Sequence, residues 1–453
     1  MSVRRHTARV TEILTSADAE DRERRIAGGL RQHGLVPGDR VALVTTSGAD
    51  MLCAILGALR SGIVPVLTHA ALMPAERAEL LDDADPALVV DDELLATLLA
   101  SSPIDIAPWP LARPMHFTSG TTGRAKGVWS GLLDEHDAAA LLAEELDLWQ
   151  FDSRDTHLVC SPLYHSVSIR FSGATLAAGG TVILPGAFDA ALVARTIADC
   201  APNTTFMVPS HLQRLFALGN TALPPLNGFR LVAHAGAACP EALKLRAIEA
   251  FGVDRVWEFY GSTEGQFTAC AATEWLERPG TVGRARRGRS LSVDDDGTIW
   301  CDVPPWARWE YWRDPARSAE AWRRASQPDS WGAFTVKDLG RLDDDGYLYL
   351  DGRRDDLIIT GGVNVYPAEI ENVLGRAEGV RAIAVFGVDD ERWGQRVCAA
   401  VVGTASASSL DAFAREHLAP HKRPKQYFGV EDLPHTATGK LRRSALASLL
   451  GVQ

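Results

Sequence analysis

The chain has 453 residues, of which 46% are hydrophobic and 23% are charged, with 39 glycines and 24 prolines. This composition excludes the collagen-like, disordered and disulfide-scaffold classes, and a length well above ~250–300 residues predicts at least two domains. The formal net charge of −12 argues against nucleic acid as the main partner, because binding a phosphate backbone requires a basic face.

The seven cysteines are scattered and form neither a C-x-x-C pair nor a Cys/His cluster, which is typical of buried thiols in a reducing compartment. The most apolar stretch, Met51–Leu67, is interrupted by Arg60, Gly62 and Pro65, so no run approaches the ~18–20 apolar residues of a membrane span. The N-terminus has no apolar stretch long enough for a signal peptide. We therefore expect a cytoplasmic protein without a membrane span.

Strand-like runs alternate with helix-like segments along most of the chain. Met51–Arg60 has the spacing of a helix, and extended runs are predicted at residues 40–46, 63–67, 181–185, 205–208, 230–236, 254–261 and 381–388. This alternation predicts an α/β fold with largely parallel sheets.

The pattern changes near Leu342. Asp343–Gly346 and Asp351–Gly352 predict turns on either side of a short strand, and residues 356–374 predict a strand, a Gly–Gly loop and a helix opening after Pro367. We expect a large N-terminal domain over residues 1–354 of α/β subdomains, and a small, mobile α+β domain over residues 355–453. The crowded glycine, arginine and aspartate residues at 352–356 predict a hinge between them.

The strongest local motif is Phe117–Gly127. It combines hydroxyls and glycines with a nearby lysine: Thr118, Ser119, Gly120, Thr121, Thr122, Gly123 and Lys126. Such residues suit a polyphosphate, although Ala125 and Gly127 beside the lysine exclude a Walker loop. The alternative is a solvent loop; Lys126 favours phosphate, because it is one of only six lysines in a chain with 46 basic residues.

Three further motifs each have a functional and a structural interpretation. Glu258–Glu264 ends in a carboxylate suited to Mg²⁺, or Ser262 or Thr263 simply caps a helix. Asp338, with the later Arg353, suits a ribose and its phosphate, or the two form surface ion pairs. Lys440, on a tight turn after Gly439, is a mobile catalytic cation or a surface charge. Lys244 is expected to be a helix-surface charge.

The order of these motifs resembles that of the adenylate-forming superfamily, which includes acyl-CoA synthetases, the adenylation domains of peptide synthetases and luciferases. The resemblance extends from about Gly34 to the C-terminus and rests on these segments in sequence: Thr118–Gly127, Ala235–Ala238, Tyr260–Glu264, Asp338, Gly352–Asp356, Gly361–Glu371 and Gly439–Lys440.

The resemblance implies that a carboxylic acid reacts with ATP to give an acyl-adenylate, whose acyl group then passes to coenzyme A or to a carrier-protein phosphopantetheine. It implies that Thr118 and Glu264 help to bind Mg²⁺, Lys126 belongs to the phosphate loop, Asp338 holds the ribose, Arg353 binds the ribose–phosphate region, and Lys440 is catalytic. The implied adenine site comprises Gly236, Ala237, Ala238 and Tyr260, and the implied nucleotide-binding residues also include Phe259, Gly261, Ser262 and Thr263.

The resemblance further implies that the small domain rotates about Asp355 between the two half-reactions, with Gly361 and Gly362 lining the tunnel of the thiol arm. Two departures stand out: Ala125 replaces a usual proline, and Lys337 replaces a usual glycine before Asp338, which we do not expect to disable that aspartate. Half of the 12 tryptophans lie between Trp300 and Trp331, for which we favour a repacked core or an oligomer contact over an acyl pocket.

The segment Ser161–His165 resembles the acyl-CoA synthetase version of the acyl site, so His165 and Gly236 are expected near the acid. Arg170 meets a second carboxylate of the substrate or pairs on the surface. The sequence thus predicts an acyl-CoA synthetase; the alternatives are an enzyme that loads a carrier protein and a catalytically silent nucleotide-binding relative.

Overall fold

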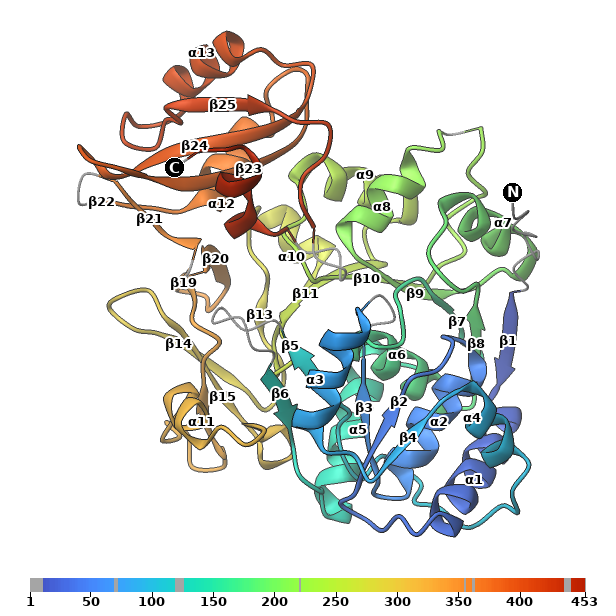
Figure 1. Cartoon of the computed structure of the whole chain (residues 1–453). Helices are drawn as coiled ribbons and strands as arrows, with labels where there is room; N and C mark the ends of the chain where they lie inside the picture. The colour runs from blue at the N-terminus through green and yellow to red at the C-terminus, as the bar shows by residue number, and fades with distance from the viewer. Residues whose placement is uncertain are drawn as a thin grey trace, which may run out of the picture.

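The computed structural model describes residues 11–68, 72–118, 126–219, 221–353, 356–360, 363–435 and 441–452. Within these ranges, the predicted alternation of strands and helices builds two large sheets in the N-terminal part and a separate sheet near the C-terminus (Figure 1). The predicted fold class, α/β with mostly parallel sheets and a C-terminal α+β unit, is confirmed.

The larger sheet has eight strands in the described residues. Its order is β1 (Glu12–Thr15), β8 (Thr181–Leu184), β7 (Thr156–Val159), β9 (Thr204–Met207), β10 (Leu231–His234), β11 (Val256–Gly261), β12 (Gln266–Ala271) and β13 (Arg284–Ala285). The five strands from β8 to β11 are parallel, and antiparallel strands close both edges. Every residue of β9 and β10 is buried, as expected for strands covered on both faces.

The second sheet carries the predicted phosphate loop. Its order is β16 (Glu310–Tyr311), β6 (Lys126–Trp129), β5 (Met115–Thr118), β3 (Val64–Leu67), β2 (Arg40–Leu43) and β4 (Leu88–Val90). Strands β5, β3, β2 and β4 are parallel, while β5, β6 and β16 are antiparallel. The loop at residues 119–125 therefore joins two paired strands, with Thr118 opposite Lys126.

Helices pack on both sheets and separate them. They are α1 (Ser16–Gln32), α2 (Ala49–Arg60), α3 (Pro74–Ala84), α4 (Asp92–Leu99), α5 (Glu135–Trp149), α6 (Ser166–Ala177), α7 (Ala190–Cys200), α8 (Pro209–Phe216), α9 (Glu241–Phe251) and α10 (Ala272–Glu277). Thr15 caps α1 by accepting a hydrogen bond from the backbone N–H of Asp18 at 3.2 Å. One hydrophobic core joins α1, α2 and the phosphate-loop sheet to α6, so the two sheets share packed helices.

Smaller elements follow the large sheets. They are β14 (Ser290–Val293), β15 (Ile299–Val303), α11 (Pro315–Ala321), β17 (Trp322–Arg323), β18 (Gly332–Phe334), β19 (Asp338–Leu342) and β20 (Leu348–Arg353). The rings of Trp309 and Trp322 lie with their centroids 5.5 Å from that of Phe334 in a buried cluster. This packing favours the core interpretation of the tryptophan-rich segment.

The turn expected at Asp351–Gly352 is wrong, because β20 continues through both residues to Arg353. The register of β19 and β20 shifts between Leu339 and Gly340. Beyond this irregularity the two strands remain paired, and Asp338 lies opposite Arg353. The pairing therefore extends the hairpin to the start of the predicted hinge.

The C-terminal sheet has β22 (Val363–Val365), β21 (Ile358–Thr360), β24 (Gly394–Gly403), β23 (Val380–Asp390) and β25 (Gln426–Gly429), with α12 (Pro367–Leu374), α13 (Ala407–His417) and α14 (Leu446–Leu449). It forms the red lobe of Figure 1, and its core is separate from those of the large sheets. The boundary at 354/355 lies outside the described residues and stays a prediction. None of the described helices is both long and apolar enough to cross a membrane.

Candidate active site

Two of the predicted nucleotide-binding segments lie at the carboxyl ends of β10 and β11. Gly236, Ala237 and Ala238 follow β10 as an exposed loop, and Gly236 has a φ of +89°, which a glycine adopts without strain. Because β10 and β11 are parallel neighbours, this loop lies beside the end of β11, where Tyr260 stands. The ends of parallel strands are the usual place for a ligand in an open α/β sheet.

The Tyr260 hydroxyl donates a 2.6 Å hydrogen bond to the Asp338 carboxylate. The structure thus joins two predicted motifs that lie in different sheets, and Asp338 is itself buried. Lys337 before it has a φ of +63°, in the left-handed region, which explains why glycine suits this position. The substituted lysine does not displace Asp338 from Tyr260.

Glu264 lies in the turn between β11 and β12, where the backbone N–H of Ser262 donates to the Gly265 carbonyl at 2.8 Å. The hydroxyl of Tyr311 donates to the Glu264 carboxylate at 3.0 Å, and both side chains are buried. Burial, followed by the nearby carboxylate, raises the pKa of Tyr311. Within the described part of the chain, the Glu264 carboxylate accepts no other hydrogen bond.

Tyr311 also connects Glu264 to the end of the phosphate loop. The Lys126 ammonium lies 5.0 Å from the centroid of the Tyr311 ring, because β16 pairs with β6. Sequence reasoning missed Tyr311, since no motif marks it and only the strand pairing brings it to Glu264. The arrangement places a carboxylate with an available oxygen close to a lysine that follows a hydroxyl-rich loop.

Several predicted residues lie outside the described ranges. They are Ser119, Gly120, Thr121, Thr122, Gly123, Asp355, Gly361, Gly362 and Lys440, together with the side chains of Thr118 and Arg353. Phe259, Gly261 and Thr263 belong to β11 and the turn after it, with Phe259 buried in a core that also holds Phe206. The functions of all these residues stay predictions.

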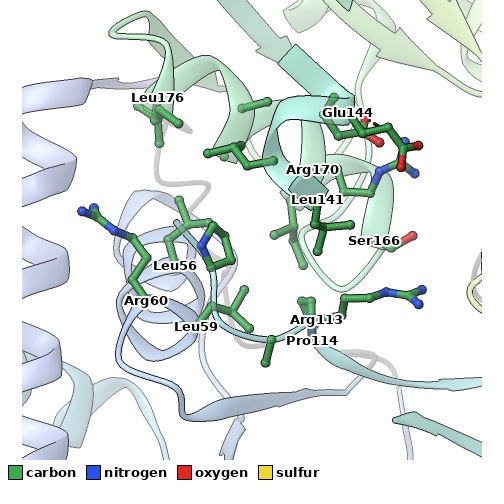
Figure 2. Close-up of a pocket in the computed structure, with 18 of the residues that line it drawn as sticks. Leu56, Leu59, Arg60, Arg113, Pro114, Leu141, Glu144, Ser166, Arg170 and Leu176 are labelled. Carbon is green, nitrogen blue, oxygen red and sulfur yellow. Dashed lines mark hydrogen bonds and ion pairs between the residues drawn. The ribbon is translucent and has the colours of Figure 1, made fainter. Parts of the chain in front are cut away.

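A cavity of about 380 Å³ lies between α2, α5 and α6 (Figure 2). Leu56, Leu59, Leu141 and Ile169 give it an apolar wall. Thr263, Gly265 and Gln266 also line it, so the cavity reaches the turn that carries Glu264. Such a cavity, apolar with a few polar groups, is typical of a site for a small organic molecule.

Charged side chains gather in the same cavity. Arg170 lines it and donates to Glu145 at 3.0 Å, so the expectation that this arginine contacts a substrate stays open, whereas the alternative of surface pairing is wrong. The pair is largely buried, with the Arg170 side chain 21% exposed and the Glu145 side chain 10% exposed. His165 precedes α6, with its ring centroid 4.7 Å from that of Tyr164, and is not among the described residues that line the cavity.

The expectation of a surface position for Lys244 is wrong. Its ammonium lies 2.5 Å from the Glu258 carboxylate, and its side chain is 1% exposed. Helix α9 carries Lys244 on the face that also buries Ala247 and Phe251 against the large sheet. The lysine therefore anchors β11 just before Tyr260.

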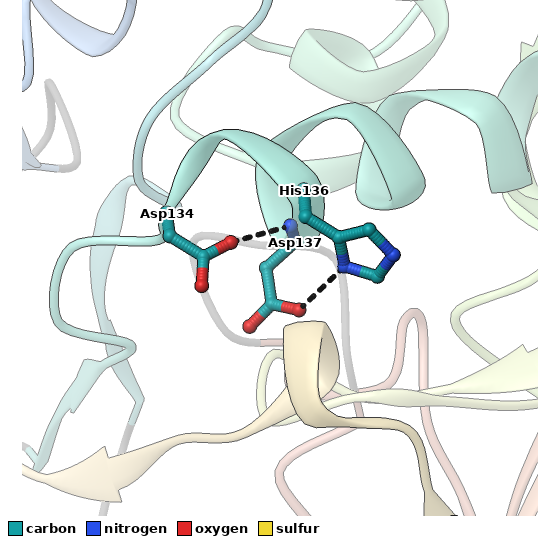
Figure 3. A group of neighbouring side chains, drawn as sticks. All are labelled: Asp134, His136 and Asp137. Carbon is teal, nitrogen blue, oxygen red and sulfur yellow. Dashed lines mark hydrogen bonds and ion pairs between the residues drawn. The ribbon is translucent and has the colours of Figure 1, made fainter.

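A separate group of possible metal ligands, Asp134, His136 and Asp137, lies at the start of α5 (Figure 3). Asp134 caps the helix by accepting a 2.8 Å hydrogen bond from the backbone N–H of Asp137, and Asp137 pairs with Arg308 at 2.7 Å. These contacts account for both carboxylates, so we assign no metal to this group.

Comparisons with known proteins agree with this geometry. The sequence model described as AMP-binding enzyme matches residues 4–109 and 112–303, and that of the AMP-binding enzyme C-terminal domain matches residues 369–440. The indoleacetate–CoA ligase of Aromatoleum aromaticum is 30% identical, over 94% of this chain and 91% of that protein.

Two solved structures share the fold over almost the whole chain. The o-succinylbenzoate–CoA synthetase (MenE) of Bacillus subtilis, in complex with the acyl-adenylate intermediate, has a TM-score of 0.81 and 25% identity, covering 95% of this chain and 92% of that one. ATP-bound MatB of Rhodopseudomonas palustris has a TM-score of 0.81 and 28% identity, covering 96% and 93%.

Proposed function

The chain belongs to the AMP-binding enzyme family, and from this premise we propose that it activates an organic acid with ATP and transfers the acyl group to coenzyme A. The predicted family and enzyme class, an AMP-forming acid–CoA ligase, are confirmed by relatives that match over nearly the whole chain. ATP and coenzyme A are the co-substrates that these relatives and structures support.

The observation that carries the proposal is the hydrogen bond from Tyr260 to Asp338. It places an aromatic ring and a carboxylate together at the ends of parallel strands, where a ring suits adenine and a carboxylate suits a vicinal ribose diol. We assign adenine to Tyr260 and the exposed Gly236–Ala238 loop, the ribose to Asp338 and Arg353, and the phosphates to Thr118–Gly123 with Lys126.

Glu264 and Thr118 would hold Mg²⁺. A carboxylate oxygen and a hydroxyl are the hard ligands this cation prefers, and Glu264 keeps one carboxylate oxygen outside its bond to Tyr311. When bound, Mg²⁺ neutralises charge on the phosphate oxygens. In the chain itself, Tyr311 holds Glu264 in one orientation, and the Lys126 ammonium adds a positive charge near the Tyr311 ring.

In the first half-reaction an oxygen of the substrate carboxylate bonds to the α-phosphorus of ATP, the bond to the β-phosphate oxygen breaks, and pyrophosphate leaves. Lys440 would lie between the two anions and stabilise the charge that develops on phosphorus. In the second half-reaction a thiolate attacks the acyl carbon and AMP leaves. We assign this step to the pose in which Gly361 and Gly362 line the thiol tunnel, reached by rotation about Asp355.

The cavity beside Thr263 would hold the rest of the acid, because it opens next to the turn that carries Glu264 and has an apolar wall. We also place the protein in the cytoplasm, because its seven cysteines are all unpaired, as in a reducing compartment.

Release of pyrophosphate tests the proposal. The purified chain is incubated with ATP, Mg²⁺ and a panel of single carboxylic acids that covers aromatic, short-chain, long-chain and dicarboxylic members. We expect release with a subset of acids, and a thioester on adding coenzyme A. If no acid releases pyrophosphate, the result supports the silent nucleotide-binding relative. If a thioester forms only with a phosphopantetheinylated carrier protein, that carrier is the acceptor instead of coenzyme A.

A further inference from the structure

One end of the cavity contains a cluster of buried charges, which we call the arginine end. Arg113, Arg170 and Arg289 line it with Glu144 and Glu145, and Arg286 lies behind them. Four guanidinium groups thus face two carboxylates in a region shielded from water. An excess of positive charge in such a place is costly unless an anion balances it.

Three of these arginines form ion pairs with the two glutamates, and each glutamate has two arginine partners. Glu145 accepts from Arg170 at 3.0 Å and from Arg286 at 2.8 Å, and Glu144 pairs with Arg289 at 2.7 Å and Arg286 at 3.0 Å. Arg170 and Arg286 hold the pKa of Glu145 well below its usual range despite burial. Both carboxylates are therefore already neutralised.

Arg113 is the remaining cation. Its guanidinium donates to the backbone carbonyls of Thr263 at 2.8 Å and Glu264 at 3.0 Å. No ion pair within 4.0 Å joins it to a carboxylate of the described residues. Burial lowers the pKa of Arg113 to about 10, helped by repulsion from Arg170 and Arg289, which is larger than the attraction to Glu264 and Glu144. Two neutral carbonyls do not replace a counter-ion for a buried charge.

The guanidinium groups of Arg113 and Arg170 line the cavity. Figure 2 shows the guanidinium groups of Arg113 and Arg170 and the hydroxyl of Ser166 on one side, with Leu56 and Leu59 on the other. Ser166 is also the first residue of α6, whose N-terminus contributes positive potential at this end. Donors therefore converge on one end of a cavity that is otherwise apolar.

We infer that the acid substrate carries a second anionic group, a carboxylate, that binds between Arg113 and Arg170, while its hydrocarbon part lies against Leu56 and Leu59. This inference rests on the proposed function, because it concerns the acid that the enzyme adenylates. The arginine end adjoins Thr263 and Gly265, so the two carboxylates of the substrate lie close together. Short dicarboxylates and ortho-substituted aromatic diacids have that spacing.

Matched pairs of acids test the inference: butyrate with succinate, hexanoate with adipate, and benzoate with phthalate. Pyrophosphate release gives kcat/KM for each acid. We expect the wild-type enzyme to favour the diacid of at least one pair by about tenfold or more, as for a charge-assisted hydrogen bond. If the best substrate of the wider panel is an acid with an uncharged remainder, the inference is wrong while the proposed function stands.

Substitution of Arg113 separates recognition from simple anchoring of the turn. In Arg113→Met we expect kcat/KM for the preferred diacid to fall about 30-fold more than for its monoacid partner, with partial recovery in Arg113→Lys. Arg287→Met removes a charge from a side chain that is 92% exposed and serves as the matched control. Equal losses on both acids would overturn the inference and leave Arg113 as an anchor of the Thr263–Glu264 backbone.

Thermal unfolding of each variant shows whether the cavity remains folded. If Arg113→Met does not fold, the comparison of Arg113→Lys with wild type on the same acid pairs decides the question, because lysine keeps the charge but loses the paired N–H groups. If no acid of any class yields pyrophosphate with the wild-type enzyme, the proposed function fails first.

Discussion

The buried ammonium of Lys244 lies 2.5 Å from the carboxylate of Glu258 and 4.6 Å from the centroid of the Trp275 ring. This pair ties α9 to β11 two residues before Tyr260. Replacing Lys244 by methionine leaves Glu258 as a buried charge without its partner, and we expect the free energy of unfolding to fall by about 3–5 kcal/mol. Urea unfolding followed by tryptophan fluorescence measures the loss.

The double variant Lys244→Met/Glu258→Leu is expected to recover most of that loss, because apolar residues of similar volume replace both charges. Arg376→Met breaks an exposed pair with Glu241 and serves as the control, with a change within about 0.5 kcal/mol. Additive losses in the double variant would contradict a coupled buried pair.

Lys244 also shows what sequence reasoning overlooked. Lys244, Ala247 and Phe251 are buried at helical spacing, so the periodicity of α9 already indicated that Lys244 lies on the buried face. A lysine on such a face requires a carboxylate partner, but the partner lies on a strand whose packing against α9 no local pattern gives. The motif that contains Glu258 was predicted, whereas the pair was not.

The nucleotide site shows the same contrast between residues that a local motif marks and contacts that only the tertiary fold creates. Tyr260 and Asp338 were predicted because each belongs to a motif whose residue types suit a nucleotide, and the structure brings them to 2.6 Å. Tyr311 and Arg113 belong to no motif. Tyr311 reaches Glu264 only through the pairing of β16 with β6, and Arg113 contacts Thr263 only because the fold brings the segment before β5 beside the turn after β11.

Tyr311→Phe removes the hydroxyl that orients Glu264 and keeps the ring beside Lys126. We expect about tenfold more Mg²⁺ to be needed for half-maximal pyrophosphate release at fixed ATP, as is usual when a partner of a metal ligand is lost. Tyr347→Phe removes a hydroxyl bonded to Glu274, away from the cavity, and should leave the Mg²⁺ dependence unchanged. An unchanged midpoint in Tyr311→Phe would argue against Glu264 as a magnesium ligand.

Lys440→Ala tests the division of labour between the half-reactions. Loss of a cation at the α-phosphate is expected to slow acyl-adenylate formation by about 10²–10³-fold. Thioester formation from synthetic acyl-adenylate and coenzyme A should be spared, because that step has no attack on phosphorus. Rapid-quench assays of each half-reaction give the two rates, and equal loss in both would assign Lys440 to folding or to general binding.

His157 gives the protein a predictable sensitivity to acid. This residue of β7 is 1% exposed, and its Nδ1 lies 3.1 Å from the Thr204 hydroxyl. Burial lowers the pKa of His157 to about 3 from an ordinary value of 6.5, outweighing attraction to Asp155. Between these two values the unfolded chain binds a proton that the folded chain does not. Stability is therefore lost as the pH falls below 6.5.

For one such histidine, the free energy of unfolding is expected to fall by about 2 kcal/mol between pH 7 and pH 5. His157→Gln removes the titrating group. Between pH 7 and pH 5 the variant should therefore lose about 2 kcal/mol less stability than the wild type, whatever its stability at pH 7. His417→Gln changes an exposed histidine at the end of α13 and controls for the substitution itself. Urea unfolding at four pH values between 5 and 7 gives the slopes, and parallel slopes for wild type and His157→Gln would show that His157 is protonated to the same extent in both states.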